Sequence, residues 1–194
     1  MTSLSDDSSL AAAARCDPQA FGVLYDRYVG RIYAYALRQT GNPETAEDIT
    51  SAAFEKALRH LQQKGWRSGS FLAWLYRIAR NEAIHQYRKG RRQVAWQEQV
   101  DGNPSHEAAL EIEQERDRVR KALMRLKTYD REVLNLRFIE GLSSAEAAEV
   151  LDWSVQKLYL RVHRALQRLR KELQAEAGIV VDKQVIYEDE EETP

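Results

Sequence analysis

The chain of 194 residues contains a single cysteine, Cys16, so no disulfide can form within it and a reducing compartment is indicated. It has no apolar run approaching the ~20 residues that a membrane-spanning helix needs, and its N-terminus lacks the basic and apolar segments of a secretory signal. The four histidines are scattered, so they form no metal-site spacing with the cysteine, and no Walker-type glycine loop occurs. These absences argue against an enzyme and predict a cytoplasmic protein without membrane insertion, metal or cofactor.

The chain also lacks an overall excess of either charge, because 29 Lys and Arg residues oppose 30 Asp and Glu residues. Their distribution is nevertheless uneven. Residues 76–92 contain six basic residues and one acid, Glu82, whereas residues 188–192 are all acidic. The six basic residues are Arg77, Arg80, Arg88, Lys89, Arg91 and Arg92. A local basic face, rather than the mean charge, is what a nucleic-acid-binding protein presents.

Apolar residues recur at intervals of three and four along most of the chain, which predicts an all-α fold. Asp17-Pro18 is typical of a helix N-terminus, and Gly41-Asn42-Pro43 predicts the end of that helix and the start of the next. A further helix is predicted from Phe71 to about Arg91. Its expected inward side chains are Leu72, Leu75, Tyr76, Ala79, Ala83 and Tyr87.

In the second half of the chain, a highly charged helix is predicted over 107–126 and another over 129–140. Thr128 is the expected N-cap of the latter, and Gly141 its C-terminal stop. Strand-like patterns occur only near the C-terminus, at 179–181 and 185–187.

The segment Ser143-Ser-Ala-Glu146 fits a capping box, which begins a short helix that ends near Leu151. Asp152-Trp153 forms the predicted turn, and Ser154 caps a longer helix. Its apolar stripe comprises Val155, Leu158, Val162, Leu166 and Leu169, and its basic face comprises Lys157, Arg161, Arg164 and Arg168. This arrangement is typical of a helix-turn-helix, whose second helix enters the DNA major groove. The alternative is an ordinary helical hairpin with solvated charges, although the small Ala147-Ala148 pair favours closely crossing helices.

An aromatic and glycine/serine loop, Trp66 to Ser70, precedes the basic helix that begins at Phe71. Such a layout suits single-stranded or melted nucleic acid, because cations follow the phosphates while bases stack on other side chains. Several apolar residues at helical spacing are nevertheless expected in the core: Phe71, Trp74, Leu75 and Ile78. Two interpretations also exist for Glu47-Asp48, since acids near a helix N-terminus favour the helix dipole or form a docking surface for a positively charged partner.

Four segments, in this order, resemble the bacterial sigma factors of RNA polymerase, specifically the small extracytoplasmic-function (ECF) kind. They are Asp17–Tyr28 (opening helix), Thr45–Ile49 with Phe54 (polymerase-binding helix), Ser70–Asn81 (melting and reading of the −10 element) and Leu142–Arg170 (reading of the −35 element). The resemblance covers residues 17–173. It implies two small helical domains joined by a flexible linker: an N-terminal segment 1–16, a region 2 domain 17–93, a linker 94–112, a region 4 helix-turn-helix domain 113–176 and an acidic tail 177–194.

The resemblance also implies an alternative sigma factor, which binds the polymerase core and directs promoter-specific initiation. Its expected partners are the clamp helices and flap of the core, promoter DNA and an anti-sigma factor. The residues implied for core binding are Glu47, Asp48, Ile49 and Phe54. Those implied for the −10 element are Arg67, Ser68, Ser70, Arg77, Arg80, Asn81, Arg88, Arg91 and Arg92. Those implied for the −35 element are Gln156, Lys157, Tyr159, Leu160, Arg161, His163 and Arg164.

The chain departs from the family's pattern at the start of the recognition helix, where Gln156–Arg161 replaces a common Gly-Thr-Val-Lys-Ser-Arg segment. Leu160 there either reads a thymine methyl group or packs on another protein surface. In the docking helix, Ala52 replaces a common acid. The tail after Ala177 is either a disordered, solubilising end or a cover for a basic DNA-reading face.

Two other functions compete with a sigma factor. One is a stand-alone helix-turn-helix regulator that binds operators without polymerase, which would need only the second half of the chain. The other is an RNA-binding adaptor, which only the basic run in the first half favours.

Overall fold

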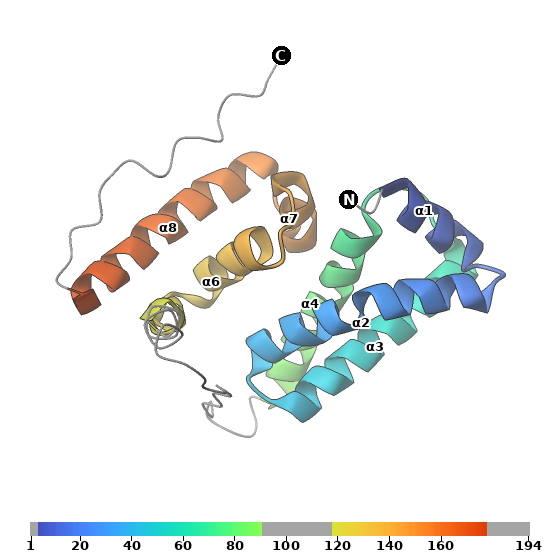
Figure 1. Cartoon of the computed structure of the whole chain (residues 1–194), viewed down its shortest axis with the longest axis horizontal. Coiled ribbons are helices and arrows are strands. Elements are labelled where there is room, and N and C mark those ends of the chain that lie inside the picture. The colour runs from blue at the N-terminus through green and yellow to red at the C-terminus, as the bar shows by residue number, and fades with distance from the viewer. Residues whose placement is uncertain (1–3, 91–117, 178–194) are drawn as a thin grey trace, which may run out of the picture. The chain divides into compact units, whose positions relative to one another are not determined.

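The computed structural model describes residues 4–90 and 118–177, and every regular element in those two ranges is a helix (Figure 1). The elements are α1 (Leu4–Ala13), α2 (Pro18–Thr40), α3 (Pro43–Lys64), α4 (Phe71–Gly90), α6 (Thr128–Leu134), the π-helical segment η1 (Asn135–Ile139), α7 (Ser144–Leu151) and α8 (Val155–Ala177). Residues 118–125 are also helical. The all-α prediction is therefore confirmed.

Several predicted features lie outside the described residues, namely the linker 94–112, most of the helix 107–126, and the strand-like and acidic segments of the tail. The chain divides into two compact units. Unit 1 comprises Met1–Gly102 and Leu136–Leu158, and unit 2 comprises Asn103–Asn135 and Tyr159–Pro194.

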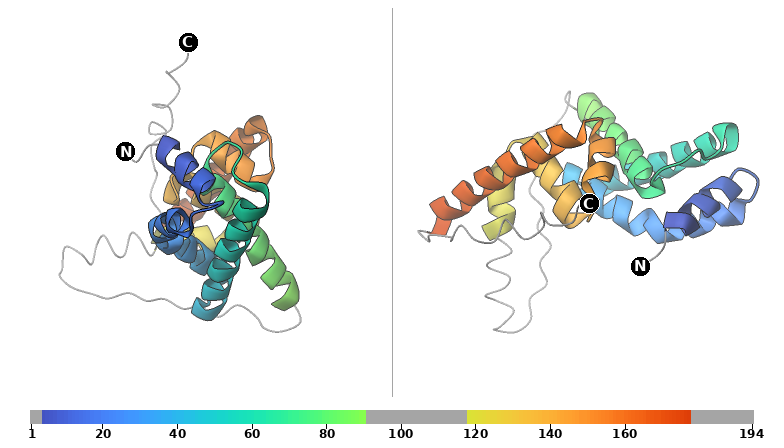
Figure 2. Two further views of the ribbon diagram at one scale, coloured as in Figure 1. Left: turned by 90° about the vertical axis from the view of Figure 1, so that its right-hand side faces the viewer. Right: turned by 90° about the horizontal axis from the view of Figure 1, so that it is seen from above.

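Unit 1 is built on α2, α3 and α4, which pack against one another, while α1 lies along α2 (Figures 1 and 2). The largest fully buried side chains of these helices are Leu24, Ile32, Tyr35, Ile49, Leu61, Phe71, Leu75 and Tyr76. Each large apolar side chain of this kind stabilises the fold by about 1.5–3 kcal/mol relative to exposure. Tyr87, predicted to face inward on α4, is instead 56% exposed, so that prediction was wrong. The apolar stripe therefore ends before the last turns of α4.

The ends of α2 and α3 follow the predicted capping. The Asp17 carboxylate accepts a hydrogen bond from the Gln19 amide at 2.9 Å, and Asn42 accepts one from the Thr45 amide at 2.8 Å. Gly41 closes α2 in the left-handed conformation, with φ of 66°, which favours glycine because a Cβ atom is disfavoured there.

Helix α1 was not predicted from the sequence. Its Asp7 carboxylate is buried and accepts hydrogen bonds from Arg27 and Tyr28 of α2. Burial, followed by the bond to Asp7, raises the pKa of the Tyr28 phenol to about 12. Because these partners lie 20 and 21 residues further along the chain, the helix pattern alone gave no sign of the contact.

The helix-turn-helix segment has the predicted local geometry at its first helix. Ser143 and Glu146 form the complete capping box at the start of α7. Asp152 ends α7 in the left-handed conformation, with φ of 57°. The Ser154 hydroxyl then accepts a hydrogen bond from the Lys157 amide at 3.2 Å, which begins α8. Both predicted caps are confirmed.

Unit 2 contains residues 118–125, α6 and most of α8. Its buried apolar residues are Leu126, Leu134 and Ala165, against which Leu123, Leu166 and Leu169 pack. Thr128 was predicted as the N-cap of the helix here, but α6 already includes Thr128, and Lys127 before it makes no side-chain cap. That prediction was wrong. The helix also changes to π geometry at Asn135, which the apolar pattern did not indicate.

Phe54 tests how far the core of unit 1 depends on one aromatic side chain. Its ring lies 4.8 Å from the Tyr25 ring and is only 3% exposed. We expect Phe54→Ala to lower the free energy of unfolding by about 3–5 kcal/mol, because truncating a buried ring leaves a cavity. Urea denaturation followed by circular dichroism measures this. Phe54→Leu is the control and should cost much less; equal costs would contradict the packing role.

Candidate nucleic-acid interface

The loop from Trp66 to Ser70 is held in place by aromatic packing beneath it. The Trp66 ring lies 5.7 Å from Phe71 and 5.4 Å from Trp74, both at edge-on angles. Phe71, Trp74 and Leu75 are buried, as predicted for core residues, while Ile78 is half-buried. The aromatics thus fix the shape of the loop from below rather than lying open to stack on bases.

The loop presents polar groups above this aromatic layer. Arg67 and Ser68 are exposed. Gly69 has a φ of 102°, a conformation that other residues rarely adopt. The Ser70 hydroxyl accepts a hydrogen bond from the Ala73 amide at 3.2 Å, which begins α4. Burial, and then the cations Lys64, Arg67 and Arg77, lower the pKa of His60 below its ordinary value.

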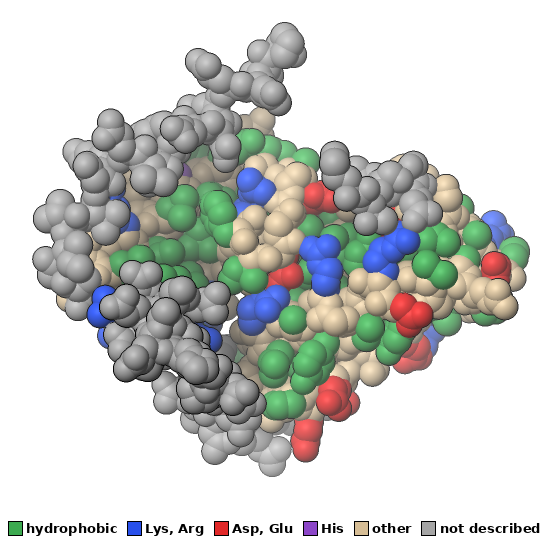
Figure 3. Space-filling model, viewed as in Figure 1, with side chains coloured by type: hydrophobic (Ala, Val, Ile, Leu, Met, Phe, Trp, Pro, Cys, Tyr) green, Lys and Arg blue, Asp and Glu red, His purple; other side chains and the backbone are tan. Residues whose placement is uncertain are grey.

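Helix α4 carries the described part of the predicted −10 set. Arg77 and Arg80 are half-buried and Asn81 is exposed, while Glu82 is buried and ion-paired with Lys56 of α3. The side chain of Arg88 and the whole of Arg91 and Arg92 lie outside the described residues. On the face drawn in Figure 3, blue Lys and Arg side chains occur in small groups between apolar and acidic ones.

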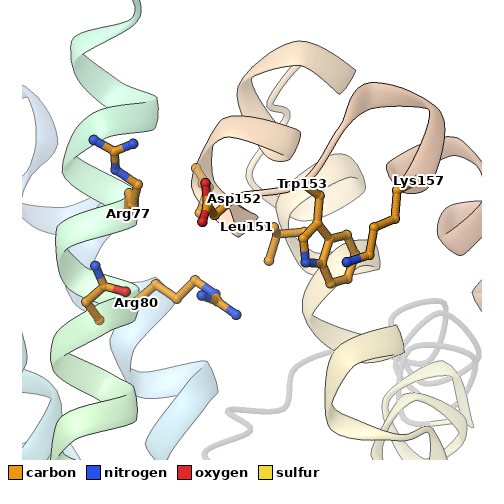
Figure 4. Close-up of a pocket in the computed structure, with 8 residues that line it drawn as sticks. Arg77, Arg80, Leu151, Asp152, Trp153 and Lys157 are labelled. Carbon is orange, nitrogen blue, oxygen red and sulfur yellow. The ribbon is translucent and has the colours of Figure 1, made fainter.

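A groove of about 680 Å³ lies within unit 1 beside these residues (Figure 4). Its lining residues are Arg77, Arg80, Asn81, Val150, Leu151, Asp152, Trp153 and Lys157. Arg80 extends from α4 toward the turn, where the Lys157 ammonium lies 4.6 Å from the centre of the Trp153 ring. This distance is within the range of a cation–π interaction.

The predicted polymerase-docking residues divide into two groups on α3. Glu47 and Asp48 are exposed. Ile49 is fully buried and Phe54 is 3% exposed, so neither side chain is open to a partner in this structure. Ile49 and Phe54 therefore hold α3 in the bundle, and only the two acids are placed to meet another molecule.

The predicted −35 set on α8 is exposed with one exception. Gln156, Lys157, Tyr159, Leu160, His163 and Arg164 are all exposed. Arg161 is half-buried, with its Nε atom 3.5 Å from the carboxylate of Asp130. Asp130 has no exposed surface and also binds Arg168 through its other oxygen. Its carboxylate thus fixes α8 against α6 inside unit 2.

Sequence reasoning missed Asp130. In the sequence it is an acid in the first turn of a helix, where favourable interaction with the helix dipole is sufficient explanation. Its partners lie 31 and 38 residues later in the sequence, so only packing brings them together.

Together these features define a helical DNA-binding protein with a helix-turn-helix and a second, loop-based polar surface. Two family models match the chain: Sigma-70 region 2 over residues 24–93 and Sigma-70, region 4 over residues 116–169. The chain is 30% identical over 173 residues to the ECF RNA polymerase sigma factor SigL of Mycobacterium tuberculosis, covering 88% of this chain and 97% of that protein. It is 34% identical to the RNA polymerase sigma factor YlaC of Bacillus subtilis, covering 77% of this chain and 90% of YlaC.

The chain is also 34% identical to the ECF RNA polymerase sigma factor BldN of Streptomyces coelicolor, although it spans only 61% of that longer protein. Among solved structures, CnrH in complex with the cytosolic domain of CnrY is similar with a TM-score of 0.65 and 34% identity, covering 89% of this chain and 99% of CnrH. The chain therefore belongs to the sigma-70 family of RNA polymerase sigma factors, in its ECF group.

None of the helices in 4–90 and 118–177 is long and apolar enough to cross a membrane. Within the same ranges, no group of three His, Cys, Asp or Glu side chains is arranged to hold a metal ion.

Asp130 can be tested by a conservative change. We expect Asp130→Asn to lower the free energy of unfolding by about 1–2 kcal/mol, because it weakens the charge-assisted hydrogen bond from Arg168 and removes the ion pair with Arg161. Thermal and urea denaturation measure this change. Glu172→Gln is the matched control, since its contact with Arg125 at 4.0 Å lies between largely exposed side chains. A loss no larger than that of the control would show that Asp130 does not hold α8.

Proposed function

We propose that this chain is an alternative sigma factor that reads both promoter elements through the two surfaces described above. At the −10 element, the exposed Arg67 and Ser68 with Ser70 would hold a base flipped from the non-template strand, while Arg77, Arg80 and Asn81 would engage its upstream edge. The observation that carries this proposal is the division of the loop into a buried aromatic support and an exposed polar surface. That division gives a rigid loop without using the aromatics as base platforms. We assign Arg88, Arg91 and Arg92 to the same strand on sequence grounds alone.

At the −35 element, α8 would enter the major groove with its exposed residues. Arg164 is suited to a bidentate contact with guanine, and Leu160 to a thymine methyl group. Tyr159 and Leu160 are 59% and 60% exposed, which supports their access to a surface outside the chain. Since Arg161 is bound to Asp130, its role would be to orient α8 rather than to read a base.

The polymerase core would be the principal partner. The exposed acids Glu47 and Asp48 of this chain would contact the clamp helices of the core, and the region 4 domain would contact its flap. Because CnrH, and the RpoE of Bartonella quintana in its complex with NepR, are sigma factors solved with their partners, we also propose an anti-sigma factor for this chain. The protein would act in the cytoplasm by binding alone, and polymerase would supply the chemistry.

In vitro transcription tests the proposal directly. The protein is added to purified core polymerase on a library of genomic promoter fragments. We expect initiation at discrete start sites only when the protein is present. If it neither binds core nor supports initiation, yet still binds duplex DNA, the stand-alone operator-binding regulator becomes the better account.

Docking is tested at Asp48. We expect Asp48→Arg to abolish co-elution with core polymerase in gel filtration, because it places a cation against a basic clamp surface, while circular dichroism stays unchanged. Asp26→Arg is the matched control, an equal charge reversal at an exposed position of α2. Retained co-elution of the Asp48→Arg protein would refute the assignment.

Base reading is tested at Arg164. We expect Arg164→Ala to weaken binding of holoenzyme to its −35 element by about 1–3 kcal/mol and to relax the preference at one base pair. Lys171→Ala, an exposed position about two turns further along α8, should weaken binding to all sequences equally. An unchanged base preference in the Arg164→Ala protein would reassign this arginine to phosphate or solvent.

A further inference from the structure

Glu140 is a buried acid at the point where the chain leaves η1 and enters the helix-turn-helix. The residue is 5% exposed and has three partners from the helical bundle of unit 1, two at its side chain and one at its backbone carbonyl. Arg38 of α2 forms an ion pair with one carboxylate oxygen, and the Tyr76 hydroxyl of α4 donates to the other. Arg31 of α2 donates to the Glu140 backbone carbonyl at 2.6 Å.

The tyrosine that donates to Glu140 lies in the core of the bundle. Tyr76 is fully buried, with its ring 5.3 Å from the Tyr35 ring and the Arg31 guanidinium 6.0 Å from its centre. Burial, followed by the bond to Glu140, raises the pKa of the Tyr76 phenol above its ordinary value. The hydroxyl therefore loses one of its two hydrogen-bond partners, Glu140 rather than Arg31, when the segment that carries Glu140 moves away.

The same arrangement brings α7 against α4. The Glu146 carboxylate at the start of α7 lies near the loop: burial alone would raise its pKa, but hydrogen bonds from Ser70 and Ser143 and the Arg31 charge lower it. Ser70 is one of the residues proposed to hold the flipped base. Its hydroxyl is thus engaged by the helix-turn-helix.

Further along α4, the groove described above separates Arg77 and Asn81 from Asp152 and Trp153. Its volume of about 680 Å³ is that of a small-molecule pocket. Proteins that bind single strands instead follow about 4–16 nucleotides in an open channel. A strand that follows α4 across this groove would meet α7 and its turn, with the Asp152 carboxylate opposite Arg77 and Asn81.

We infer that Glu140, Tyr76 and Arg38 form a latch that holds α7 over the −10-reading face of α4 in the free chain, and that polymerase or melted DNA must release it. The inference rests on the proposed function for the role of the covered face. The latch is polar, and the Arg38 side chain is 37% exposed. Because water can replace such bonds once the groups separate, the net cost of breaking them is smaller than their strength in the closed state.

A distance measurement in the free, full-length chain tests the closed state. Cys16 is replaced by serine, and spin labels are attached at Gln63→Cys on α3 and Ala145→Cys on α7, both exposed positions. We expect one narrow distance distribution in the otherwise unchanged protein. Glu140→Gln and Tyr76→Phe should each give a broader distribution that extends to longer distances, while Glu149→Gln, an exposed acid of α7, should not.

Binding of single-stranded DNA tests whether α7 covers the −10-reading face of α4. The probe is a fluorescent random-sequence oligonucleotide, and its anisotropy is followed with unlabelled proteins. If release raises the open fraction from about one tenth to about one half, the apparent affinity tightens about five-fold. Glu149→Gln controls for the loss of a negative charge in Glu140→Gln, and Tyr76→Phe changes no charge at all.

The latch would be overturned if all four proteins gave the same distance distribution. It would also be overturned if Glu140→Gln and Tyr76→Phe both bound the DNA no more tightly than Glu149→Gln does. If Glu140→Gln fails to fold in thermal circular dichroism, Tyr76→Phe decides alone, because it keeps the buried ring. Failure of the proposed function is distinguishable, since it appears as absent transcription with core polymerase whatever the distances in the free chain.

Discussion

The apolar face of α4 is the constraint on which the rest of unit 1 depends. Phe71, Leu75 and Tyr76 are buried against α2 and α3, so the rotation of α4 about its axis is fixed. That rotation leaves Arg77, Arg80 and Asn81 on the opposite, polar side. The same packing fixes the loop before α4, because Trp66 can reach Phe71 and Trp74 only in this register. The proposed −10 surface is thus a consequence of where the core lies.

Buried acids that bind basic residues from distant segments recur in both units. The described pairs are Asp7 with Arg27, Glu82 with Lys56, Glu140 with Arg38, and Asp130 with Arg168. In each pair the acid is the more buried partner and the base keeps contact with water. A buried pair of this kind adds little net stability, but removing one partner leaves an uncompensated charge. These acids therefore specify which helices meet, while the apolar core supplies the stability.

Helix positions and caps were largely predictable from the sequence, because both arise from interactions within a few residues. Asp17, Asn42, Ser143 and Ser154 cap their helices as expected. Helix α1 was missed because the neighbouring helix, rather than its own pattern, holds it. Thr128 was misassigned because its hydroxyl has the right chemistry, whereas the chain there enters the helix one residue earlier. The π-helical segment η1 was missed because its five residues are too few to show a changed apolar period.

The candidate sites also have some features that local interactions predict and others that depend on tertiary packing. The sequence by itself determined the residue types and their order: a polar loop before a basic helix, and a capped helix-turn-helix after it. Only the tertiary structure decided which of those side chains are accessible. In the folded chain Ile49 and Phe54 are buried, Arg161 forms an ion pair with Asp130, and α7 packs against α4. The physical reason is range: capping and periodicity act over three or four residues, whereas burial and ion pairing depend on partners that the chain brings close only after it has folded.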